Sequence, residues 1–98
     1  MKKKFGTKEL ERKIGKMTFA NAIESQRLCE EMTLKEFSTF LGISIASLAD
    51  LEKGRRIPSP SRAFEIAKKL GEPEAYWVQL AIQDKLIEEE IYFKVTVA

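Results

Sequence analysis

The feature of this sequence that most constrains its fold is a pair of short helix signals separated by one glycine. Thr33 is followed three residues later by Glu36, which is the spacing of a capping box at the start of a helix. Gly42 predicts the end of this helix, because a helix C-terminus often needs a left-handed residue. Ser44 then caps a second short helix. Two short helices, each with its own cap, predict a helix-turn-helix over roughly residues 33–53.

Apolar residues at helical spacing predict three further helices around this unit. Their starts are marked by Thr18, by Ser59 with Pro60 at the first helical position, and by Pro73. The expected fold class is therefore all-α with five helices. The three further helices are predicted at about residues 19–31, 60–70 and 74–88. The residues expected to face the core include Phe19, Ile23, Leu28, Phe37, Leu41, Leu48, Leu51, Ala63, Ile66, Ala67, Leu70, Trp77, Leu80, Ala81 and Leu86.

The end of the chain changes to the period of a β-strand. Ile91, Phe93, Val95 and Val97 alternate with tyrosine, lysine and threonine. We expect an ordered strand rather than a disordered end, and a lone strand needs the edge of a partner. The sequence thus predicts three parts. They are a basic arm at 1–17, a helix-turn-helix domain at 18–88 and, at 89–98, a short C-terminal β-strand for dimerisation or partner binding.

Composition argues against enzymes and metal proteins. The chain has no histidine, which removes the commonest general base and metal ligand, and its single cysteine is Cys29. We therefore expect no metal site, no cofactor and no enzyme activity, with Cys29 unreactive. A chain without an intrachain disulfide suits a reducing cytoplasm. No apolar run approaches the ~20 residues that span a bilayer, so a membrane partner is not expected.

Charge is segregated along the chain although the net charge is only +2. Residues 1–16 hold seven basic and two acidic side chains, and residues 55–71 hold five and one. The segments 17–54 and 72–98 are acidic overall. Two basic blocks in an otherwise acidic chain indicate a polyanionic partner such as DNA, with ordinary solubilising charge as the alternative.

Several residues and motifs between positions 27 and 71 occur at characteristic spacing. They are Arg27, the segment 33–44, Leu48, the run Leu-Glu-Lys-Gly-Arg-Arg-Ile-Pro at 51–58, and the segment 66–71. In these residues the chain resembles the Cro/C1-type (XRE) helix-turn-helix family. The resemblance implies a five-helix domain that binds double-stranded operator DNA as a homodimer and regulates transcription, most simply as a repressor of its own or nearby genes.

The same resemblance assigns roles to single residues. Arg27 and Glu52 match a family pair that forms an ion pair between helices, which makes them structural residues. The base-edge positions fall on Ile45, Ala46, Ser47 and Asp50. Base reading by hydrogen bonds prefers Arg, Lys, Asn or Gln, so sequence readout is expected to be weak. Asp50 could accept from cytosine N4 but also repels phosphate.

The sequence offers more residues suited to phosphate contact than to base reading. Helix N-termini and basic side chains are the groups that bind phosphates. The expected phosphate contacts are Thr33 and Ser44 at helix starts, and Lys53, Arg55 and Arg56 in the loop that follows the second helix of the unit.

A narrower resemblance leaves a second function open. The segments 58–71 and 74–86 are similar to short helix-turn-helix antitoxins of the HigA type. Such a protein neutralises a small ribonuclease toxin by direct binding and represses its own operon. A cognate small toxin would then be a further partner, and a gene for a small basic ribonuclease beside this one would distinguish the two functions.

Overall fold

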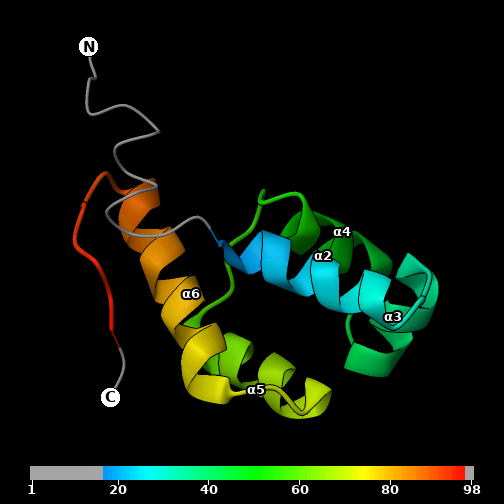
Figure 1. Cartoon of the computed structure of the whole chain (residues 1–98). Coiled ribbons are helices and arrows are strands. Elements are labelled where there is room, and N and C mark those ends of the chain that lie inside the picture. Colours follow the sequence, from blue (N-terminus) through cyan, green and yellow to red (C-terminus); the bar gives the residue numbers. More distant parts are fainter. Residues whose placement is uncertain (1–16, 97–98) are drawn as a thin grey trace.

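A computed structural model of the protein describes residues 17–96 and places five α-helices there (Figure 1). The expected all-α class with five helices is confirmed. Residues 1–16, which make up nearly all of the predicted basic arm, and residues 97–98 lie outside the described part. The helices are α2 (Phe19–Cys29), α3 (Leu34–Leu41), α4 (Ile45–Glu52), α5 (Pro60–Leu70) and α6 (Glu74–Glu88).

Helix α2 ends at Cys29, two positions before the expected residue 31. Glu31 adopts a left-handed conformation with φ of 56°, and the N–H of Met32 donates to the carbonyl of Arg27 at 3.2 Å. This wrap turns the chain toward α3. It leaves Leu28 58% exposed, so the expectation that Leu28 faces the core is wrong.

All five helices contribute to one hydrophobic core. The ring of Phe19 on α2 meets the indole of Trp77 on α6 edge-on, with centroids 5.4 Å apart and planes at 89°. Such a pair adds about 0.5–1.5 kcal/mol beyond the burial itself. This contact fixes α2 against α6 from the first residue of α2. The buried hydrophobic residues are Phe19, Ala22, Ile23, Phe37, Leu41, Leu48, Leu51, Ala63, Ile66, Ala67, Trp77, Leu80 and Ala81.

A carboxylate makes a second link between the same two helices. Oδ2 of Asp84 on α6 accepts a hydrogen bond from the backbone N–H of Phe19 at 2.9 Å. Desolvation raises the pKa of Asp84, and the hydrogen bond from Phe19 offsets only part of that rise. The carboxylate therefore satisfies an N–H group at the start of α2 at an electrostatic cost when it is ionised.

The predicted C-terminal β-strand is not formed. Residues 91–96 are irregular and run back alongside α6 (Figure 1). The reason is that no other strand lies within residues 17–96 to pair with them. The side-chain amide of Gln83 takes that place, since its Nε2 donates to the carbonyl of Phe93 and its Oε1 accepts from the N–H of Val95, both at 2.7 Å.

Candidate nucleic-acid interface

The N-termini of α3 and α4 both lie at the surface and both carry side-chain caps. Oγ1 of Thr33 accepts from the N–H of Glu36 at 3.1 Å, and the carboxylate of Glu36 accepts from the N–H of Thr33 at 2.9 Å. Oγ of Ser44 accepts from the N–H of Ser47 at 3.0 Å. Thr33 and Ser44 are exposed. Exposed helix N-termini carry partial positive charge and free N–H groups, which suits them to phosphate oxygens.

The turn between α3 and α4 is held from α5. Gly42 ends α3 with φ of 75°, a conformation that L side chains rarely adopt. Nζ of Lys69 on α5 donates to the carbonyl of Leu41 at 2.8 Å, and a Cβ added at Gly42 would lie 3.1 Å from the same nitrogen. Lys69 thus satisfies an orphan carbonyl at the end of α3 and fixes the position of α5 relative to the turn.

The outer face of α4 carries the four residues predicted at base edges. Ala46 and Asp50 lie one turn apart on the side opposite the buried Leu48 and Leu51. Ile45 is 45% exposed at the start of the helix, and Ser47 is half-buried beside α5. Their accessible groups are methyls, one hydroxyl and one carboxylate, so α4 itself offers no two-donor side chain.

The loop after α4 folds back onto Asp50. Nε of Arg55 donates to Oδ1 of Asp50 at 3.0 Å, and the backbone N–H groups of Arg55 and Arg56 donate to the carbonyl of Asp50 at 2.9 and 3.3 Å. Gly54, with φ of 75°, makes this return possible, and Lys53 stands exposed at the end of the helix. A predicted base reader and a predicted phosphate contact are therefore joined in one ion pair.

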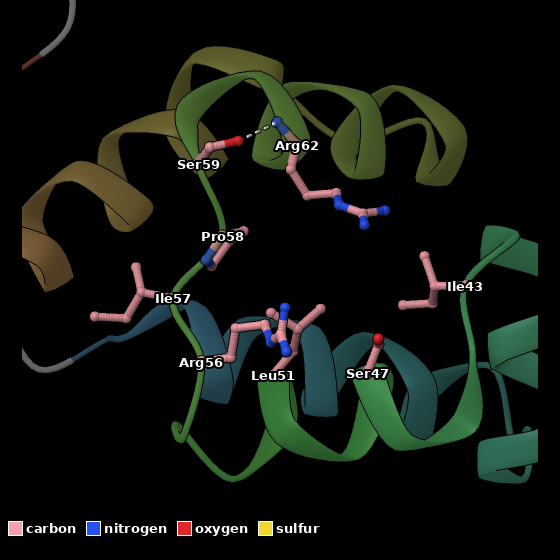
Figure 2. A pocket seen from close by; sticks show the side chains of 8 residues that line it. All are labelled: Ile43, Ser47, Leu51, Arg56, Ile57, Pro58, Ser59 and Arg62. Carbon is pink, nitrogen blue, oxygen red and sulfur yellow. Dashed lines mark hydrogen bonds between the residues drawn. The ribbon is translucent and has the colours of Figure 1, made fainter.

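A cleft of about 230 Å³ separates α4 from the start of α5. Figure 2 shows the guanidinium groups of Arg56 and Arg62 directed into it, with the hydroxyl of Ser47 facing them from α4. Ser59 Oγ caps α5 by accepting from the N–H of Arg62 at 3.2 Å, which sets the first turn of α5 at the rim of the cleft. Two cations, a hydroxyl and a helix N-terminus thus converge on one opening at the surface.

Arg27 and Glu52 form a bidentate ion pair between α2 and α4. Nε of Arg27 lies 2.7 Å from Oε2 of Glu52, and Nη2 lies 3.1 Å from Oε1. Nη1 of the same guanidinium donates to the carbonyl of Met32 at 3.0 Å, which links the pair to the chain just before α3. The hydrogen bonds to Glu52 raise the pKa of Arg27 further above its usual value, so this group stays charged.

Comparison with known proteins places this geometry in a family. Residues 23–77 match the helix-turn-helix family model HTH_3 of the Cro/C1 type, which covers more than half of the chain. The chain belongs to this helix-turn-helix family. Comparisons with curated proteins and with solved structures returned no match. This is a family of DNA-binding proteins. In this chain α3 and α4 are the two helices of the motif, and α4 stands at the position of the recognition helix.

Charges on the helix-turn-helix surface are arranged to favour a polyanion. Both carboxylates of α4 are paired, Asp50 with Arg55 and Glu52 with Arg27. Among residues 17–96 no ion pair engages Lys53, Arg56 or Arg62. These three cations are exposed around the end of α4 and the cleft, where a phosphate backbone would meet them without breaking an internal pair.

Sequence reasoning missed Arg62 as a member of this surface. Arg62 does not lie in the loop after α4 but six residues after Arg56, inside the first turn of α5. Its signal was nevertheless present. An arginine two residues after the proline that opens a capped helix points its side chain back toward that helix's N-terminus, because helical side chains lean toward the preceding turn.

None of the helices between residues 17 and 96 is long and apolar enough to cross a membrane. Within the same residues no group of three or more Cys, Asp or Glu side chains is placed to hold a metal ion. Cys29 lies exposed at the end of α2.

Proposed function

We propose that this helix-turn-helix protein is a transcriptional repressor that binds an operator in the DNA of its own or neighbouring genes. The observation that supports this most is the convergence, around the helix-turn-helix, of two capped helix N-termini and three cations that no residue between 17 and 96 pairs. In this arrangement α4 lies in the major groove, and the surrounding groups hold the sugar-phosphate backbone on both sides.

Phosphate binding is divided between two places. Thr33 and Ser44 present the N-termini of α3 and α4 to one stretch of backbone. Lys53, Arg56 and Arg62 hold the next, with the two arginines closing on a phosphate from either side of the cleft. Ile45, Ala46 and Ser47 face the base pairs, where the first two meet thymine methyl groups and Ser47 makes one hydrogen bond.

The double variant Arg56→Ala, Arg62→Ala tests the cleft. Each neutralised phosphate contributes about 0.9 to the slope of log affinity against log salt concentration. Because both arginines close on the same phosphate, the slope should fall by about 0.9. Affinity should fall alike for operator and scrambled duplexes, because phosphates carry no sequence. The matched control is Lys68→Ala, which removes an exposed cation from the last turn of α5 and should leave the slope unchanged. An unaltered slope in the double variant would mean that the cleft does not hold the backbone.

Operator binding by this protein is proposed to require a homodimer. Support comes from apolar side chains left in water on the tail, where Tyr92 is 47% and Phe93 70% exposed. Gln83 uses one backbone edge of the tail, and within residues 17–96 no hydrogen bond uses the backbone of Lys94 on the other edge. A second tail could pair there. Light scattering of the full chain and of a variant lacking residues 91–98 tests this, and a full chain that is monomeric at ~100 μM would refute it.

The exposed apolar tail could instead bind a different protein, such as a small toxin. For this reason the antitoxin function remains the second candidate. In that case the protein would neutralise a small ribonuclease toxin as well as repress its operon. Expression of the whole locus, followed by purification of this protein, separates the two. Stoichiometric co-purification of the neighbouring gene product, together with loss of its ribonuclease activity, would establish the antitoxin function.

A further inference from the structure

We propose that Arg55, oriented by Asp50, reads a guanine in the major groove. The proposal rests on the proposed function, since it requires α4 to lie against base edges. It replaces the phosphate contact that the sequence predicts for Arg55 and the direct base contact that it predicts for Asp50. The pair becomes one reading unit, in which the carboxylate positions and the guanidinium contacts the base.

The need for such a unit follows from the composition of α4. Reading guanine requires two parallel donors directed at O6 and N7, and an arginine fork is the side chain that most often supplies them. Ala46 and Ser47 on the outer face of α4 cannot do so, because one has no donor and the other has a single hydroxyl. The guanidinium of Arg55 contacts this face directly, through its hydrogen bond to Asp50.

The geometry fixes Arg55 at two points on residue 50. The backbone N–H of Arg55 donates to the carbonyl of Asp50 at 2.9 Å, and the side-chain Nε donates to its Oδ1 at 3.0 Å. A guanidinium has five N–H donors, and Nε accounts for one. Within residues 17–96 no hydrogen bond engages Nη1 or Nη2 of Arg55. The two-nitrogen end of the fork therefore remains available, in an orientation already set before DNA is met.

Arg55 and its neighbour Arg56 differ in their electrostatic surroundings. A carboxylate at 3.0 Å cancels much of the potential around Arg55, which weakens it as a phosphate anchor but leaves its directional hydrogen bonds. Arg56 has no such partner among the described residues and faces the cleft (Figure 2). Two adjacent arginines thus serve different parts of the DNA, one a base and the other the backbone.

The experiment uses the full chain and an operator duplex selected by wild-type protein from a random library. Each guanine in turn is replaced by 7-deazaguanine, which removes the N7 acceptor and keeps base pairing. Wild-type affinity should fall about 10- to 100-fold at one guanine in each half-site. Arg55→Ala removes the donors, so it should bind normal and substituted duplexes alike. Its salt slope should stay unchanged, because Arg55 holds no phosphate in this assignment. Asp50→Asn should narrow the difference in affinity between normal and substituted duplexes without removing it.

The matched control is Arg56→Ala, which should lower the affinity for both duplexes but keep the full sensitivity to 7-deazaguanine at that position. If Arg55→Ala retains the wild-type sensitivity, or if no single guanine is sensitive in a duplex that wild type binds specifically, the assignment of Arg55 is wrong and the proposed function stands. If the selection yields no sequence preferred over random DNA, the proposed function fails and this assignment fails with it.

Discussion

The ion pair between Arg27 and Glu52 gives the most direct prediction about stability. Arg27→Ala removes one partner of a bidentate pair and also the hydrogen bond from Nη1 to the carbonyl of Met32. Glu52 keeps its charge, and its side chain is only 7% exposed, with that of Arg27 at 16%. Breaking a fully buried pair costs ~3–5 kcal/mol, and breaking an exposed one rarely costs more than ~1 kcal/mol.

Because this pair lies closer to the buried limit, Arg27→Ala should lower the free energy of unfolding by about 2–3 kcal/mol. For a domain of this size, 1 kcal/mol shifts the midpoint by about 4–8 °C, so the melting temperature should fall by about 10–20 °C. Thermal and urea unfolding followed by circular dichroism measure both quantities. Below the melting transition the variant should still bind DNA, because in this account Arg27 does not contact it.

A double-mutant cycle with Glu52→Ala isolates the pair itself. The losses of unfolding free energy in the two single variants should sum to about 1–3 kcal/mol more than the loss in the double variant. The reason is that the second substitution removes the uncompensated carboxylate. Lys85→Ala is the matched control, as it breaks an exposed pair with Glu88 and should not shift the melting temperature measurably. Additive losses of stability in the cycle would refute the structural role. An unchanged melting temperature combined with lost DNA binding would also refute it and would make Arg27 a phosphate contact.

Three further perturbations test other links in the fold. Burial raises the pKa of Asp84, so the stability gained from its protonated form is lost as pH rises through that pKa. The stability of Asp84→Asn relative to wild type, measured by urea unfolding, should therefore increase as pH rises above the usual pKa of an aspartate. A difference in stability that stays constant with pH would show that the carboxylate carries no desolvation cost. Gln83→Leu should release the tail, seen as faster amide hydrogen exchange at Val95 with little change elsewhere, and unchanged exchange would disprove the clamp. Thr33→Ala should cost about 1 kcal/mol by removing the cap of α3, whereas Thr33→Ser should restore most of it.

Much of the fold could be predicted from sequence because local chemistry specifies it. The capping box at Thr33, the left-handed glycine at Gly42 and the cap at Ser44 all occur at the predicted positions. These signals act within a few residues, so they survive without knowledge of the tertiary structure. The starts of α5 and α6 were predictable for the same reason, from a serine-proline start and from a proline.

The tail was mispredicted because its structure depends on a residue of the preceding helix. Alternation of apolar and polar residues indicated a β-strand, but a strand needs a partner edge. The side-chain amide of Gln83 supplies that edge instead, and it leaves the apolar Phe93 in water. A single glutamine in a helix forms no sequence pattern from which its hydrogen bonds to the tail could be predicted.

Within the candidate interface, the sequence predicted which residues contact DNA but not which of them pair with one another. Asp50 and Arg55 were expected to act separately, on a base and on a phosphate. Their ion pair forms because Gly54 reverses the chain, and five residues of separation do not reveal that return. Arg62 joins the cleft for a similar reason, since only the angle between α4 and α5 brings it opposite Arg56.

Sequence-specific binding of DNA through α4 is the property on which the proposed function depends. It is measured by a competition titration of the full chain on a labelled duplex from the region upstream of its own gene, at fixed salt concentration. We expect the unlabelled upstream duplex to compete at least ~10-fold better than a scrambled duplex of the same composition, because each half-site offers few base contacts of ~1–3 kcal/mol each. Equal competition by the two duplexes would show that the protein does not recognise a sequence there.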